Sequence, residues 1–312
     1  MSKQTINRRE ALQFIGVAAA MPIAKQSPEV VSEIKKNSFT YCLNMATIRG
    51  HQLGFVKELE TASKAGFHSV EIWIDTLQEY LQKGGTLKDV NRRLYDLGLK
   101  VENLISFAQW IVDDEATRKQ GIEQMKTEMG LMAEMGGKRI AVTGKGMTNE
   151  SNISLDVIAG RYRTILELGD KTGVVPQLEM WGFMKKMSRV SEVTYIAMES
   201  SHPSAKILLD IFHLYKGSTS LDELALLNPM AVDILHMNDY PVNLPAKVIE
   251  DSDRIYPGDG IAPIKHTLQM LGNADRSLVL STEVFNKEYY KQDALTVAKT
   301  ALDKMKVIVG NI

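Results

Sequence analysis

Four residues that could bind a metal ion or transfer protons stand near the ends of apolar runs. The runs are VPQLEMW, AKILLDIF, VDILHMND and SLVLSTEVF, and the residues in question are Glu179, Asp210, His236 and Glu283. Successive members are about one strand and one helix apart, with a longer gap before Glu283. Taken singly, each acid could make a structural hydrogen bond, but four such residues at equivalent positions favour one shared site.

The charges of this set predict a bound cation. Three carboxylates that converge in a buried pocket would repel one another and take up protons. A divalent cation removes that cost. An oxygen-rich ligand set with one imidazole and no thiolate suits Mn²⁺, Mg²⁺ or Co²⁺, and Zn²⁺ also fits.

A second histidine follows the aspartate in the stretch ILLDIFHLYKG. Asp210 and His213 are three residues apart. In a regular strand such residues point to opposite faces, so they cannot share a site there. They converge only if the strand ends near Asp210 and the chain bends, and we therefore expect His213 to reach the site from a loop.

The elements that must position these residues alternate along the chain. Strand-like runs are expected at 39–45, 69–74, 100–106, 139–144, 175–181, 205–212, 232–239 and 277–285, and segments of helical period follow each one. Continuous apolar strands indicate a parallel sheet covered by helices. Eight such units predict a single α/β domain, a (β/α)8 TIM barrel with its active site at the C-terminal ends of the strands. The absence of a G-x-G-x-x-G motif after the first strand weakens the doubly wound alternative.

Composition limits the function classes. The chain has 312 residues with 37 basic and 38 acidic side chains, so nothing suggests a nucleic-acid partner. Its single cysteine, Cys42, excludes an internal disulfide and a thiolate metal cluster, and we expect it to be a packed small hydrophobe. The last helical segment has apolar positions that could serve a homo-oligomer interface or pack on the barrel.

The first residues have the features of an export signal. Arg8 and Arg9 precede an apolar stretch that is too short to span a bilayer. This pattern resembles a twin-arginine signal, with Ala11 in place of the usual aromatic. We expect a signal peptide at 1–24, a linker at 25–37 and the barrel at 38–312. The mature protein would then be periplasmic and free of the membrane, whereas an amphipathic helix is the alternative interpretation of the same stretch.

The order of these residues resembles that of the xylose isomerase-like barrels, more narrowly the sugar phosphate isomerase/epimerase family. The likeness covers about residues 38–312. Besides the four residues above, it rests on the spacing Asp210-x-x-His213 and on Arg254, which precedes the motif PGDG. The resemblance implies that the set of four binds the metal and that the two glutamates exchange protons with substrate carbon. It also implies that His213 and Arg254 hold substrate oxygens, although an insert before Arg254 departs from the family pattern.

The chemistry that these residues imply acts on a carbohydrate. A cation that bridges a carbonyl and a neighbouring hydroxyl stabilises the enediolate formed when an α-proton leaves. Return of the proton gives epimerisation or isomerisation, whereas loss of a β-substituent would make a keto-sugar or inosose dehydratase or a 3-keto-glycoside lyase. Trp110 and Trp181 fall just past strand ends and could stack on a sugar ring, or simply pack.

Two other classes compete with the metal-dependent sugar isomerase or epimerase. A nuclease of the same superfamily that cuts abasic DNA with a trinuclear zinc centre would need more than the six histidines present and a basic groove. A non-catalytic sugar-binding barrel would be favoured by loss of Glu179 or Glu283, and both are present.

Overall fold

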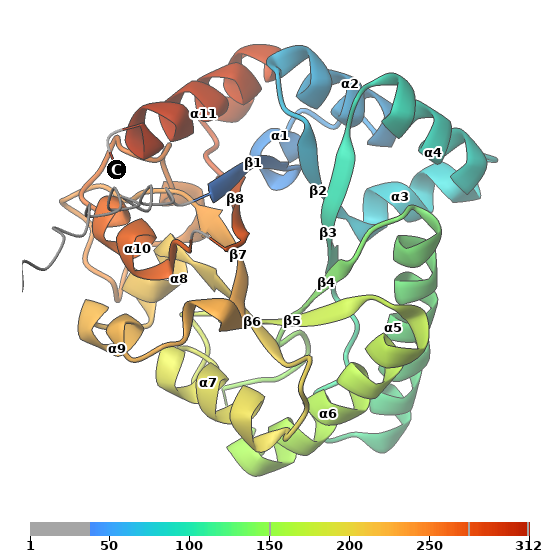
Figure 1. The fold of residues 1–312 in the computed structure, drawn as a ribbon, viewed down its shortest axis with the longest axis vertical. Helices are drawn as coiled ribbons and strands as arrows, with labels where there is room; N and C mark the ends of the chain where they lie inside the picture. The colour runs from blue at the N-terminus through green and yellow to red at the C-terminus, as the bar shows by residue number, and fades with distance from the viewer. Residues whose placement is uncertain (1–37, 150, 274, 311) are drawn as a thin grey trace, which may run out of the picture. The chain divides into compact units, whose positions relative to one another are not determined.

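The computed structural model describes residues 38–149, 151–273, 275–310 and 312. In this part of the chain eight parallel strands pair in chain order, and the last pairs with the first to close a barrel (Figure 1). The strands are β1 Ser38–Asn44, β2 Ser69–Trp73, β3 Lys100–Ser106, β4 Arg139–Val142, β5 Val175–Glu179, β6 Lys206–Asp210, β7 Val232–Met237 and β8 Ser277–Thr282. The predicted (β/α)8 barrel is confirmed.

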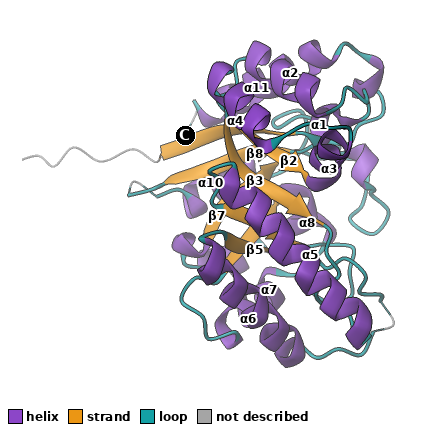
Figure 2. Ribbon diagram, turned by 90° about the vertical axis from the view of Figure 1, so that its right-hand side faces the viewer, coloured by secondary structure: helices purple, strands orange, loops and turns teal. Residues whose placement is uncertain are grey.

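Helices surround the strands, as Figure 2 shows from the side. The α-helices are α1 Ala46–Arg49, α2 Phe55–Ala65, α3 Ile74–Gln82, α4 Leu87–Asp96, α5 Glu115–Glu134, α6 Leu155–Thr172, α7 Val190–Glu199, α8 Ile211–Lys216, α9 Leu221–Ala225, α10 Ile264–Leu271 and α11 Ala294–Val309. Short 3₁₀ turns are η2 Pro229–Ala231, η3 Asp251–Asp253 and η4 Tyr289–Lys291. No helix in the described ranges is long and apolar enough to cross a membrane.

Local sequence explains where several helices begin. Asp114, Ser154 and Asp293 each cap a helix by accepting a backbone N–H from the first turn. The long helical segment expected after the second strand is two helices, because Gly84 adopts a φ of 92° and Thr86 caps a new start.

The barrel interior contains a small apolar layer below the polar end. Its members come from six strands and are Cys42, Ile105, Ala141, Leu208, Ile234 and Val279. Cys42 is fully buried there, as expected, and burial raises the pKa of its thiol well above the ordinary value. This thiol is therefore a packing group rather than a nucleophile.

Several of the expected strands extend too far at their C-terminal ends. β5, β6 and β8 end at Glu179, Asp210 and Thr282, two or three residues before the predicted ends. The apolar residues just past these points include Met180, Phe212 and Val284, which are buried, so composition alone continues the strand pattern past the barrel. The predicted signal peptide at 1–24 and linker at 25–37 lie outside the described residues.

Candidate metal and catalytic site

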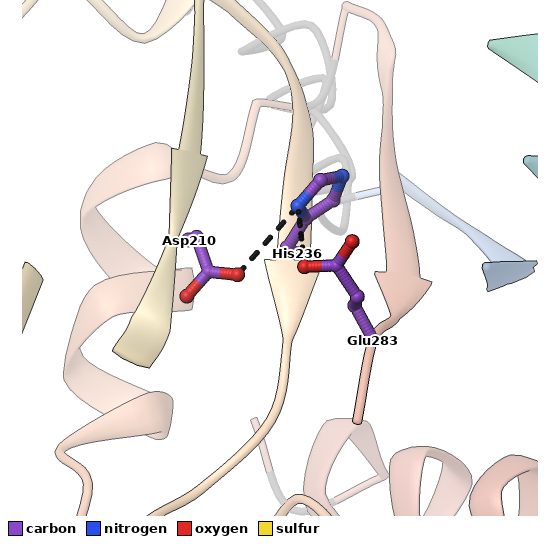
Figure 3. Close-up of side chains that lie close together, drawn as sticks. All are labelled: Asp210, His236 and Glu283. Carbon is purple, nitrogen blue, oxygen red and sulfur yellow. Dashed lines mark ion pairs between the residues drawn. The ribbon is translucent and has the colours of Figure 1, made fainter. Parts of the chain in front are cut away.

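Three potential metal ligands meet at the C-terminal end of the barrel (Figure 3). Nδ1 of His236 lies 3.2 Å from Oε2 of Glu283 and 3.6 Å from Oδ2 of Asp210. One ligand atom from each residue lies within 4.8 Å of the others. Oε1 of Glu179 lies 3.7 Å from the same nitrogen. The structure therefore brings together all four residues predicted from the strand ends.

Strand register explains the convergence. His236 is paired with Asp210 on β6 and with Ser281 on β8, so the three residues lie at one level of the barrel. Glu283 follows Ser281 by two residues and therefore points to the same inner face. The alternation of the last strand thus directs its glutamate at the histidine.

Glu71 binds the other nitrogen of this histidine. Nε2 of His236 lies 3.0 Å from Oε2 of Glu71, and since a carboxylate only accepts, Nε2 carries the proton. Glu71 also accepts hydrogen bonds from Asn44 at 2.9 Å, Asn103 at 2.6 Å and Ser281 at 2.5 Å. Burial would raise the pKa of Glu71, but His236 and these donors more than offset it, and the net pKa is lowered. A carboxylate behind a ligating histidine orients the ring and makes it more basic.

The donor set fits a divalent cation. Nδ1 of His236 and Oε2 of Glu179 are buried and have no hydrogen-bond partner among the described residues. With a proton on Nε2, Nδ1 faces three carboxylate groups, whose charge is offset either by a second proton on Nδ1 or by a cation bound in its place. Burial would lower the pKa of His236, yet Glu283 and Glu71 raise it well above its usual value. Burial, with repulsion from Glu283 and Glu71, raises the pKa of Glu179 to about 8 against the opposing effect of His236.

Arg254 is the cation that the described chain itself supplies to this cluster. Its Nη1 donates to Asp210 and to Glu283, each at 2.8 Å, and its Nη2 lies 2.6 Å from Asp251. The guanidinium stacks over the Phe212 ring at 4.4 Å, and the side chain is 1% exposed. The long insert between β7 and Arg254 does not displace this arginine from the site.

Asp239 holds the loop that carries Arg254. One carboxylate oxygen accepts the backbone N–H groups of Gly258 and Gly260, both at 3.0 Å. The other accepts those of Tyr240 and Ala262, both at 2.8 Å. A side chain at position 260 would bring its Cβ to 2.2 Å from the Tyr240 carbonyl oxygen. The PGDG motif therefore wraps closely around one buried carboxylate.

His213 lies on a helix rather than on the expected loop. Asp210 is the N-cap of α8, and its carboxylate accepts the backbone N–H of His213 at 2.9 Å. The Asp-x-x-His spacing places the aspartate so that its carboxylate caps the backbone N–H three residues further along the chain. Burial lowers the pKa of His213 to about 4, against the opposing effect of Asp210, so the ring is neutral at pH 7. Its Nε2 accepts from Arg254 at 3.3 Å, which leaves the proton on Nδ1.

Aromatic rings surround the cluster, but Trp110 is not among them. Trp181 packs on Phe183, which lies edge-on to His213, so Trp181 is near the site as expected. Trp110 is fully buried, donates to the Thr143 carbonyl oxygen and contacts the Tyr162 ring. The expected stacking of Trp110 on a substrate is wrong, because its ring is enclosed between the sheet and a helix.

Three functional positions escaped the sequence reasoning or were underweighted there. Glu71 is a lone glutamate inside the apolar strand SVEIWI, and that is the signal the sequence gives for it. Asn44 ends β1 and donates to Glu283 at 3.0 Å, and Asn238 donates to Asp210 at 3.1 Å. Asparagine at a strand end is too common to single out without the fold.

Fold and site together define a (β/α)8 barrel whose mouth carries a carboxylate–histidine cluster. A family model described as xylose isomerase-like TIM barrel matches residues 59–307. The chain belongs to this family.

Individual relatives support the same placement. An inosose isomerase of Bacillus licheniformis is 26% identical over 274 residues, covering 86% of this chain and 97% of the relative. An inosose isomerase of Halalkalibacterium halodurans is 27% identical over 276 residues, covering 86% and 96%. A crystal structure of IOLI protein with a binding zinc atom has a TM-score of 0.80 and 23% identity, covering 88% of this chain and 99% of that one.

Proposed function

We propose that this protein is a divalent-metal-dependent isomerase or epimerase that acts on a sugar or keto-sugar. The observation that carries the proposal is the position of His236 Nδ1, which lies 3.2–3.7 Å from carboxylate oxygens of Asp210, Glu283 and Glu179 while Glu71 contacts the opposite nitrogen. Relatives named inosose isomerases that align with 86% of the chain support an enzyme of this class.

Glu179, Asp210, His236 and Glu283 would hold the cation. When bound, a divalent cation such as Mn²⁺, Mg²⁺, Co²⁺ or Zn²⁺ polarises a substrate carbonyl and offsets the charge that proton removal creates. The shell of three carboxylates and one imidazole suits the harder ions of this series.

Two glutamates would exchange protons with substrate carbon. Glu179 ends β5 and Glu283 follows β8, so they approach the centre from strands that are not neighbours. Oε2 of Glu179 makes no hydrogen bond within the described residues, whereas both oxygens of Glu283 accept, from Asn44 and Arg254. Removal of a proton by one and its return by the other gives inversion at carbon, and return to the adjacent carbon gives isomerisation.

Polar and aromatic groups near the centre can orient the sugar. Arg254 would contact substrate oxygens by exchanging one of the present partners of its Nη groups. Neutral His213 carries an Nδ1–H that has no partner among the described residues. Trp181 and its neighbour Phe183 provide an apolar surface for the ring. Carbohydrate sites combine such directed polar groups with aromatic faces.

Solvent exchange tests the proposal. The protein is incubated with Mn²⁺ in D₂O and a panel of ketoses and inososes, and deuterium at the α-carbon is followed by NMR. We expect exchange with at least one compound and a loss of about 10²–10⁴-fold in Glu283→Gln. Absence of exchange across the panel, in protein shown to contain the metal, would contradict the proposal. Release of water or an alcohol during exchange would mark the reaction as a lyase.

We also propose that the chain is exported to the periplasm by its N-terminal arginine pair. The motif at Arg8 and Arg9 supports this. Replacement of both by lysine should retain the uncut protein in the cytoplasm, as judged by cell fractionation and the mass of the N-terminal peptide. Equal distribution of wild type and variant would refute export by this route.

A further inference from the structure

One buried amide contacts the carboxylates on both sides of His236. Asn44 is the last residue of β1 and is fully buried. Its Nδ2 donates to Oε2 of Glu71 at 2.9 Å and to Oε1 of Glu283 at 3.0 Å. Glu71 contacts Nε2 of His236, and Glu283 lies beside Nδ1 of the same ring. The NH₂ group of Asn44 therefore bridges the two carboxylates that flank the imidazole.

Strand pairing places Asn44 at this point. Asn44 is paired with Glu71 on β2. Glu283 directly follows the end of β8, the strand that pairs with β1 on its other side. Cys42, two residues before Asn44, belongs to the apolar layer inside the barrel, so Asn44 points to the same interior. The barrel itself, rather than a loop, sets the position of this amide.

Two donors fix the orientation of the Asn44 amide. Its Oδ1 accepts the backbone N–H of Ala46 and the Nε1–H of the Trp73 indole, both at 2.9 Å. Both partners can only donate, so this atom must be the oxygen, and the NH₂ group must face the two carboxylates. The Trp73 ring is held in turn by Phe107, with ring centres 5.1 Å apart, and by the Arg49 guanidinium at 4.4 Å. The indole therefore keeps the amide from turning over.

The amide also determines which oxygen of Glu283 faces the candidate cation. Oε1 accepts from Asn44, whereas Oε2 lies 3.2 Å from Nδ1 of His236. Loss of the Nδ2 donor would leave Glu71 and Glu283 with one hydrogen bond fewer each. It would also release Oε1, so the carboxylate of Glu283 could turn about its last torsion.

We propose that Asn44 is a positioning residue of the metal centre. Its amide directs Oε2 of Glu283 to the cation, and the Trp73 indole holds that amide in place. Asn44 acts through Glu283 and is not itself a ligand. The inference rests on the proposed function, which places a cation beside His236. Hydrogen bonds that orient metal ligands in this way change metal affinity about 10–100-fold.

Calorimetric titration of the full chain with Zn²⁺ tests the inference. Asn44→Ala removes the amide, and Asn44→Leu removes it while keeping a side chain of similar volume. We expect each variant to bind Zn²⁺ about ten-fold or more weakly than the wild type. Trp73→Phe removes only the indole donor and should cause a smaller loss, because Ala46 still binds the amide oxygen. Unchanged affinity in both Asn44 variants would overturn the inference.

The Trp73 indole gives a second readout, in the wild-type protein. Zn²⁺ is diamagnetic, so the indole N–H resonances can be followed by NMR during the titration, and Trp73→Phe assigns the signal. We expect the Trp73 resonance to shift as the site fills, because Glu283, Asn44 and Nε1 form one chain of hydrogen bonds. Trp110, which donates to the Thr143 carbonyl oxygen, is the internal control. A filled site with an unmoved Trp73 resonance would contradict the proposed link.

A matched control lies on the same strand. Thr40, on the same face of β1 near its other end, bonds the Ser277 hydroxyl at 2.7 Å. Thr40→Val should leave Zn²⁺ affinity unchanged. A loss equal to that of Asn44→Ala would show that any weakening of β1 affects the metal, and the positioning role would be wrong.

The outcomes separate this inference from the proposed function. Zn²⁺ binding that depends on Asn44, without any solvent exchange, would refute the proposed function alone. Solvent exchange by the metal-loaded wild type, with Zn²⁺ affinity unchanged in both Asn44 variants, would refute this inference alone.

Discussion

At the scale of single residues, the site depends on how one imidazole is held between opposing groups. Glu71 holds a proton on Nε2 of His236, and Nδ1, beside Glu283 and Asp210, is then the nitrogen at which a cation would bind. Without Glu71, the ring could place its proton on either nitrogen, and the metal-binding tautomer would be one of two.

Glu71→Gln should therefore weaken metal binding. The amide NH₂ of the variant would face donors from Asn44 and Ser281 or from His236, so the tautomer of the ring is no longer imposed. We expect Mn²⁺ affinity to fall about 10–100-fold, measured by calorimetry at pH 7. Far-UV circular dichroism checks the fold, and the surface change Glu123→Gln serves as the matched control. An unchanged Mn²⁺ affinity would mean that Glu71 has only a structural role.

Glu58 should make stability depend on pH. Burial raises its pKa from 4.5 to about 7 in the folded protein. The folded state therefore binds the proton more tightly than the unfolded state, and the free energy of unfolding falls as pH rises from about 4.5 to 7. The loss at this residue amounts to up to about 3 kcal/mol. Urea denaturation of wild type and Glu58→Gln across this range measures it. If the difference between the two proteins is constant with pH, Glu58 does not titrate as described.

Sequence reasoning found the residues that end strands and missed those that support them. Glu179, Asp210, His236 and Glu283 stand out because each interrupts an apolar run at the same point of a repeating unit. Residues that act through another residue leave no such pattern, because their partners come from distant strands: Asn44 and Glu283 are 239 positions apart. The stacking of Trp110 on substrate was wrong for a different reason. Its position after a strand does not reveal which way its ring faces.

At the scale of elements, the junction of β6 and α8 places two candidate site residues three positions apart. Asp210 is both the last residue of the strand and the N-cap of the helix. The sequence predicted the bend but not the helix, because α8 has six residues and shows little periodicity. The cap interaction therefore orients Asp210 and His213 together.

The loop after β7 depends on Asp239 in a comparable way, and Asp239→Asn should displace Arg254. An amide can accept only on its oxygen, so two of the four bound N–H groups would face an NH₂ group. We expect KM for the substrate to rise at least ten-fold with a smaller change in kcat, since under the proposed function Arg254 would hold substrate oxygens and take no part in proton exchange. Steady-state kinetics on the compound found by solvent exchange gives both constants.

The matched control for this change lies in the same motif. Asp259 is exposed and pairs with Lys304 at the surface of the loop. Asp259→Asn should leave KM and kcat near the wild-type values. Equal effects of the two substitutions would show that the loop responds to any loss of charge, and the assigned positioning role of Asp239 would be wrong.

At the scale of the whole barrel, the fold was predictable because its eight units repeat one pattern. Apolar runs followed by helical segments specify the topology without any knowledge of side-chain contacts. The ends of the strands were less predictable, because Phe212 and Val284 are apolar and buried although they lie beyond the sheet.

The two ends of the barrel should also respond differently to mutation, because the N-terminal end carries an ion network of its own. Asp233 on β7 lies 3.4 Å from Arg139, 3.5 Å from Lys206 and 3.7 Å from Arg276. Asp233→Asn would remove the carboxylate that these three cations share, although Arg139 would keep its ion pair with Glu102. We expect the free energy of unfolding to fall by about 1–3 kcal/mol. Metal affinity and kcat should not change, because contacts at this end serve stability while the opposite end carries the chemistry.

Three measurements on this variant test the prediction. They are urea denaturation for stability, Mn²⁺ titration for metal affinity and steady-state kinetics for kcat, each beside the exposed control Asp303→Asn. A loss of metal affinity that equals the loss of stability would show that the two ends are coupled.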